Sequence, residues 1–125
     1  GADDNASGTA GLLEIARLLG GRRAPAARTV VFVAFAAEEL GVIGSAHYVK
    51  HAPHPIDSTC AMINLDMVGR LRAGTLTAFG AASAREFPAL LDSLAAAHRL
   101  TVKGSGGSNC DLVFASGILT SETCP

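Results

Sequence analysis

Apolar residues recur along the chain with two spacings, and each spacing predicts a different kind of element. Near the N-terminus they fall at Leu12, Ile15, Ala16 and Leu19, which is the i, i+3, i+4, i+7 pattern of one helix face. Polar residues that cap helices precede this pattern, and a pair of glycines follows it. The N-terminal part of the chain is therefore predicted to form an amphipathic helix that ends at the glycines.

Continuous apolar runs predict strands instead. Residues 29–35 and 60–65 are both apolar throughout most of their length, and residues 75–79 form a shorter run. Runs without polar alternation are typical of strands that are buried on both faces, as in parallel sheets covered by helices. The first two runs are therefore expected to be neighbouring, parallel strands.

Helices are predicted between these strands. One should span about residues 40–51, where two prolines close it, and another should start near Phe87, because Pro88 suits a first helical turn. Residues 101–109 are rich in Gly and Ser and are expected to form a loop. The order of elements predicts an α/β fold: three layers, with a mostly parallel or mixed β-sheet flanked by helices.

Composition narrows the function classes. The 125 residues suit one domain, 49% of them are hydrophobic, and the net charge is −1. Such a chain can form a core, and it has no basic field for nucleic acid and no apolar stretch that would span a membrane. Three scattered cysteines are too few for a disulfide framework, and Cys60, in an apolar run, is expected to be a buried free thiol.

Acidic residues occur where chemistry is expected in such a fold. Asp4 precedes the first helix, Glu38 and Glu39 follow the first predicted strand, and Asp66 follows the second. Parallel strands end at a common edge of the sheet, where ligands bind in open α/β folds. Carboxylates that are close together cannot all ionise without cations. The pattern therefore predicts a site for two divalent metal ions, with one further carboxylate as a general base.

Three motifs also resemble the M28 family of co-catalytic zinc aminopeptidases. They are Gly1-Ala2-Asp3-Asp4-Asn5-Ala6-Ser7-Gly8, Ala37-Glu38-Glu39-Leu40-Gly41 with Gly44-Ser45 and Tyr48, and Asn64-Leu65-Asp66-Met67-Val68-Gly69. The resemblance implies two Zn2+ ions and a peptide substrate that loses its N-terminal residue. It also implies that Asp4 bridges both ions, Glu38 is the general base, Glu39 ligates one ion and Asp66 the other. Asn5, Ser7 and Gly8 are expected to be structural.

The chain departs from the family pattern at the histidine ligands. The family's first histidine lies upstream of the bridging aspartate, before the first residue here. At the place of the second, this chain has Cys110, followed by Asp111. Either side chain could replace the histidine, because zinc binds thiolate and carboxylate. His47 and His51, at i, i+4 spacing, could hold a metal in principle, but such pairs also occur by chance.

We therefore interpret residues 1–125 as a fragment of a single zinc peptidase catalytic domain that lacks N-terminal strands and the first histidine ligand. Alone, the fragment is expected to be poorly active. The alternatives are a non-catalytic binding or scaffold domain of the same fold, and a related zinc carboxypeptidase or glutaminyl cyclase. The resemblance favours a secreted or periplasmic protein. The sequence does not determine the oligomeric state or the side-chain specificity.

Overall fold

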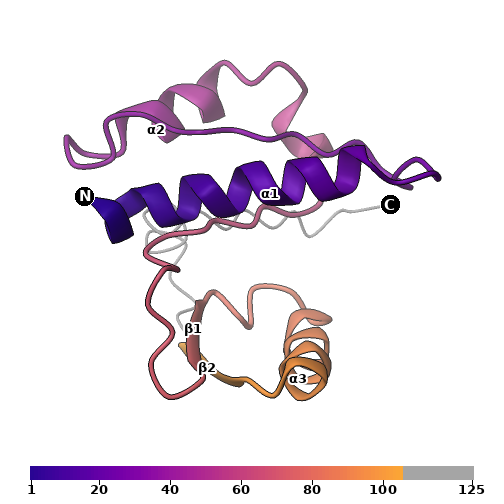
Figure 1. Cartoon of the computed structure of the whole chain (residues 1–125). Coiled ribbons are helices and arrows are strands. Elements are labelled where there is room, and N and C mark those ends of the chain that lie inside the picture. Colours follow the sequence, from indigo (N-terminus) through magenta and orange to yellow (C-terminus); the bar gives the residue numbers. More distant parts are fainter. Residues whose placement is uncertain (106–125) are drawn as a thin grey trace.

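The computed structural model describes residues 1–105, and its helices and strands follow the predicted order in part (Figure 1). The helices are α1 (Gly8–Gly20), α2 (Ile43–Lys50) and α3 (Phe87–His98), and the strands are β1 (Thr75–Phe79) and β2 (Thr101–Ser105). Two short helical segments, η1 (Ala2–Ser7) and η2 (Ile56–Ser58), accompany them. The helices and the two-stranded parallel sheet are compatible with the predicted α/β class, whereas the three-layer arrangement remains a prediction.

Helix α1 confirms the prediction from the i, i+3, i+4, i+7 pattern. Leu12 and Leu19 are half-buried, whereas Leu13 and Leu18 point into solvent. The helix ends at the predicted glycines, where the Gly21 amide donates to the carbonyl oxygen of Arg17 at 3.0 Å. The apolar face of α1 thus turns toward the rest of the N-terminal half.

A β–α–β unit follows in the lower part of Figure 1, where α3 connects two parallel strands. The register runs from Thr75 opposite Thr101 to Phe79 opposite Ser105. Helix α3 starts at Phe87 with Pro88 in its first turn, as predicted. The predicted loop over 101–109 is wrong for residues 101–105, because the β-branched Thr101 and Val102 find a strand partner in β1.

The two longer apolar runs are not strands among the described residues. Residues 30–37 have no regular secondary structure, and 60–65 show only an isolated bridge at one position. Val30 remains 48% exposed and Ile63 80%, and no hydrophobic side chain within residues 1–105 is buried. Apolar character favours a strand, but a strand forms only when a neighbour pairs with its backbone, and here these two runs border a cavity instead.

Two further expectations have an outcome in the described part of the chain. Cys60 is half-buried and disulfide-bonded, so the prediction of a buried free thiol is wrong. None of the helices within residues 1–105 is long and apolar enough to cross a membrane.

Candidate functional site

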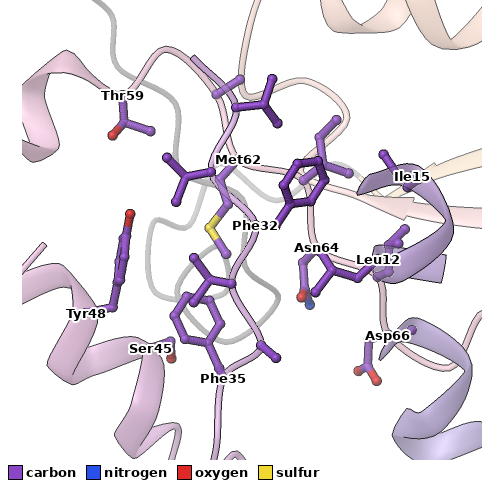
Figure 2. A pocket seen from close by; sticks show the side chains of 18 of the residues that line it. Leu12, Ile15, Phe32, Phe35, Ser45, Tyr48, Thr59, Met62, Asn64 and Asp66 are labelled. Carbon is purple, nitrogen blue, oxygen red and sulfur yellow. The ribbon is translucent and has the colours of Figure 1, made fainter. Parts of the chain in front are cut away.

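A cavity of about 1250 Å³ lies between the elements that carry the predicted site. Its walls come from α1, from residues 27–36, from α2 and from residues 54–66. Figure 2 shows Leu12 and Ile15 of α1 on one side and Tyr48 of α2 on the other, with Phe32 and Met62 between them. The interior is therefore largely apolar, as is usual for cavities that bind organic ligands.

All four predicted site residues line this cavity. Asp4 comes from η1, Glu38 and Glu39 from the turn before α2, and Asp66 from the end of the second apolar run. Each of them is exposed to solvent. Within residues 1–105, however, no three His, Cys, Asp or Glu side chains lie close enough together to hold a metal ion. The structure thus brings the four carboxylates to one cavity but does not gather them into a cage.

The turn that carries Glu38 and Glu39 is fixed by backbone hydrogen bonds. The amides of Gly41 and Val42 donate to the Glu38 carbonyl oxygen at 3.0 and 2.8 Å, and the amide of Gly44 donates to that of Ala36 at 3.1 Å. A Cβ atom on Gly44 would overlap the Ala36 carbonyl oxygen, so only glycine lets α2 approach so closely. These contacts tie the start of α2 to the residues immediately before Glu38.

The backbone on either side of this turn adopts left-handed conformations. Ala37 has φ 59° and Val42 has φ 52°, and Met67, directly after Asp66, has φ 50°. Residues with a Cβ atom adopt this conformation at a cost, and a β-branched residue such as Val42 does so rarely. Such strain often occurs near functional sites, where surrounding contacts hold the chain in place.

Asn5 connects the segment of Asp4 with the segment of Asp66. Its side-chain amide nitrogen donates to the Leu65 carbonyl oxygen at 3.0 Å, and its side-chain oxygen accepts from the Met67 amide at 3.3 Å. The same oxygen accepts from the Gly8 amide at 3.0 Å, at the first residue of α1. A single side chain thus bonds the backbone immediately before and after Asp66.

Asp3 makes a second connection to the same turn. Its carboxylate accepts from the Gly69 amide at 3.0 Å and lies 3.4 Å from the Arg70 guanidinium. The Asp3 side chain is only 15% exposed, whereas Arg70 is 69% exposed. The sequence pattern indicated no role for Asp3 and only a structural role for Asn5. The available signal was their position, one on each side of Asp4.

The histidines of the described chain do not extend the predicted set. The rings of His47 and His51 stack with centroids 4.2 Å apart, and His51 Nδ1 lies 3.0 Å from the His47 carbonyl oxygen. No third ligand joins them among residues 1–105. Cys110 and Asp111, the possible replacements for the family histidine, lie outside the described residues.

Tyr48 was noted in the sequence only as part of a motif, and the structure gives it a position. Its ring meets Phe35 edge-to-face, with centroids 5.6 Å apart and an interplanar angle of 70°. Both residues line the cavity, so this pair joins α2 to the first apolar run.

The donor set agrees with a zinc centre in its chemistry. Asp4, Glu39 and Asp66 offer carboxylate oxygens, which zinc accepts as ligands. All three line one cavity, but within residues 1–105 no three possible ligands lie close enough together to hold a metal ion. The residues present therefore fit zinc in the chemistry of their ligand atoms only.

Comparison with known proteins decides the family. A model of peptidase family M28 matches residues 1–111. The chain belongs to this family. The match includes all four carboxylates, and it extends well beyond the three motifs that first indicated it.

Curated relatives of this M28 member have consistent names. Over 70 residues it is 47% identical to aminopeptidase YwaD of Bacillus subtilis, a match that covers 55% of this chain and 15% of the relative. It is 34% identical over 122 residues to leucine aminopeptidase 1 of Uncinocarpus reesii, covering 91% of this chain and 29% of the relative. A probable zinc metalloprotease of Pyrenophora teres is 44% identical over 73 residues, which are 58% of this chain and 15% of the relative.

The chain thus spans less than a third of the length of these relatives. No solved structure matches it significantly.

Proposed function

We propose that this chain is part of the catalytic domain of a zinc-dependent aminopeptidase. The observation that carries the proposal is that Asp4, Glu38, Glu39 and Asp66, which all lie within the residues matched by the model of family M28, line one cavity. The names of the relatives support both the metal and the reaction. In the complete domain, the cavity would lie in a three-layer fold with a mostly parallel or mixed sheet.

The resemblance of the motifs to family M28 implies a role for each carboxylate. Asp4, Glu39 and Asp66 would hold two Zn2+ ions, with Asp4 between them. Zinc in such a site polarises a carbonyl group and lowers the pKa of bound water. Glu38 would act as the general base that accepts a proton from the attacking water and returns it to the leaving amine.

The residues around Glu38 suit this role. Its backbone is held by the amides of Gly41 and Val42, so the side chain projects from a fixed turn at the edge of the cavity. The apolar wall formed by Phe32 and Phe35 would exclude water from the bound peptide.

The experiment is a peptidase assay on the full-length gene product. Aminoacyl anilides should be hydrolysed, a chelator should abolish the activity, and added zinc should restore it. The same anilides with an acetylated amino group serve as matched control substrates and should not be cleaved, because an aminopeptidase recognises the free amine of its substrate.

Each alternative has its own result. Release of C-terminal residues would indicate a carboxypeptidase. Loss of ammonia from an N-terminal glutamine, without peptide cleavage, would indicate a glutaminyl cyclase. A protein that neither binds zinc nor cleaves any peptide would contradict the proposal and favour a binding or scaffold domain.

A further inference from the structure

The two carboxylates placed farthest apart in the sequence, Asp4 and Asp66, are carried by segments that are joined through side chains. Asn5 bonds Leu65 and Met67, the residues on either side of Asp66, and Asp3 bonds Gly69. The bonding residues themselves lie on either side of Asp4. Each candidate ligand is thus flanked by the residues that connect the two segments.

We propose that Asp3 and Asn5 are positioning residues that hold Asp4 and Asp66 in register for metal binding. They do so through a clamp, which consists of their side-chain hydrogen bonds to Leu65, Met67 and Gly69. The inference rests on the proposed function, since it assigns the clamp to the zinc ligands. Neither residue has to touch the metal or the substrate.

The backbone around the clamp is shaped to permit it. A Cβ atom on Gly8 would overlap the Leu65 carbonyl oxygen, and it would also lie 2.5 Å from the Asn5 side-chain oxygen. A Cβ atom on Gly69 would lie 2.8 Å from the Asp3 carboxylate oxygen. Glycine at both positions therefore lets the two segments come within hydrogen-bond distance.

The hydrogen bonds of the clamp are specific in their chemistry. Asn5 donates through its nitrogen and accepts through its oxygen, so only an amide side chain of this length can serve both partners. Asp3 uses one carboxylate oxygen to accept from the Gly69 amide, and the Ser7 hydroxyl donates to the Asp3 backbone carbonyl oxygen at 2.6 Å. Residues that orient metal ligands commonly change metal affinity or activity about 10- to 100-fold when they are mutated.

The test compares paired variants of the full-length gene product. Asp3→Ala removes the acceptor for the Gly69 amide, whereas Asp3→Asn keeps an acceptor and removes only the charge. Asn5→Ala removes both bonds of that residue, and Asn5→Asp keeps the acceptor but loses the donor. Thr9→Ala is the matched control, because its hydroxyl bonds the Asn5 carbonyl oxygen at 3.1 Å and does not reach the turn of Asp66.

Three quantities should be measured: zinc affinity by competition with a chromophoric chelator, the visible spectrum of the Co2+-substituted protein, and amide hydrogen exchange of residues 65–70 without metal. We expect Asp3→Ala and Asn5→Ala to weaken zinc binding about 10- to 100-fold, to alter the Co2+ spectrum and to speed exchange at Met67 and Gly69. Compared with the alanine variants, Asp3→Asn should retain most of the zinc affinity and Asn5→Asp should retain part of it. The zinc affinity of Thr9→Ala should stay within about threefold of the wild type.

The outcomes separate the clamp from the proposed function. If Asp3→Ala and Asn5→Ala bind zinc as tightly as the wild type, the clamp has no positioning role, even if the enzyme is a zinc aminopeptidase. The same conclusion follows if Thr9→Ala weakens binding equally, because a general loss of structure would then explain all three variants. A wild-type protein that binds no zinc would overturn the proposed function and the role of the clamp together.

Discussion

The substitution Gly8→Ala tests the contact on which the arrangement of Asp4 and Asp66 depends. Gly8 is the first residue of α1 and is buried, and a methyl group there would overlap the Leu65 carbonyl oxygen. To make room, the start of α1 must move away from the segment of Asp66. That movement would break the Asn5 bonds to Leu65 and Met67.

The magnitude follows from these bonds. Two hydrogen bonds at about 0.5–1.5 kcal/mol each amount to a loss of roughly 1–3 kcal/mol. Alanine is a better helix former than glycine by up to about 1 kcal/mol, which offsets part of the loss. The loss is thus roughly 0–2 kcal/mol with the full offset and 1–3 kcal/mol with none, and we expect Gly8→Ala to lower the free energy of unfolding by about 1–2 kcal/mol, where the two ranges overlap and where the usual cost of overpacking also lies.

The measurement is the free energy of unfolding in urea of the full-length gene product, compared between the wild type, Gly8→Ala and the control Gly20→Ala. Gly20 lies at the other end of α1, and no atom comes within 4 Å of a Cβ atom added there. Gly20→Ala should therefore leave the free energy of unfolding unchanged or raise it by about 0.5 kcal/mol. If both variants are equally stable, α1 does not approach Leu65 closely, and Asn5 does not hold the two segments together as the clamp requires.

Two further predictions concern the turn before α2 and the surface of α1. Ala37→Gly should leave the free energy of unfolding unchanged or raise it by up to about 1 kcal/mol, because it removes the strain of the left-handed backbone at Ala37. The control Ala96→Gly, within α3, should lower the free energy of unfolding by about 1 kcal/mol. Equal losses for the two variants in urea unfolding would contradict this prediction. The Arg17 guanidinium lowers the pKa of the exposed Glu14 carboxyl, with both of its nitrogen–oxygen distances at 2.7 Å. A lowered pKa in the folded state contributes stability above the unfolded pKa and loses it as the pH falls through the folded pKa. The small difference in Tm between the wild type and Arg17→Gln should therefore shrink as Glu14 protonates, and a difference that grows in acid would refute the pairing.

The elements that local patterns define were predictable from the sequence. The spacing of Leu12 to Leu19 predicted α1 and its end at Gly20, and Pro88 predicted the start of α3. The run at residues 75–79 predicted β1. In each case, the side chains and the caps of a single segment carry enough information to determine the element.

The errors arose where structure depends on a distant partner. Residues 29–35 and 60–65 have the composition of strands, but the pairing that would make them strands is not supplied by the other described residues. The loop prediction was wrong at residues 101–105. It rested on the glycine and serine content, whereas the strand forms by pairing with β1, which the local sequence does not reveal. The same limit applies to Asp3 and Asn5, whose partners lie about 60 residues further along the chain.

The candidate site was predictable only as a set of residues. The motifs identified Asp4, Glu38, Glu39 and Asp66, and the structure places them at one cavity. Within residues 1–105 these side chains do not come together as a metal site, so their individual roles remain predictions.

The turnover of Glu38→Gln in the full-length gene product, measured together with its bound zinc, tests whether Glu38 is the general base. Glutamine has nearly the same size as glutamate but cannot accept the proton from water at neutral pH. We expect the variant to retain the zinc content and substrate affinity of the wild type and to lose at least about 100-fold in kcat, the usual effect of removing a general base. A variant that retains wild-type turnover would contradict the assignment of Glu38 as the base and, with it, the proposed mechanism.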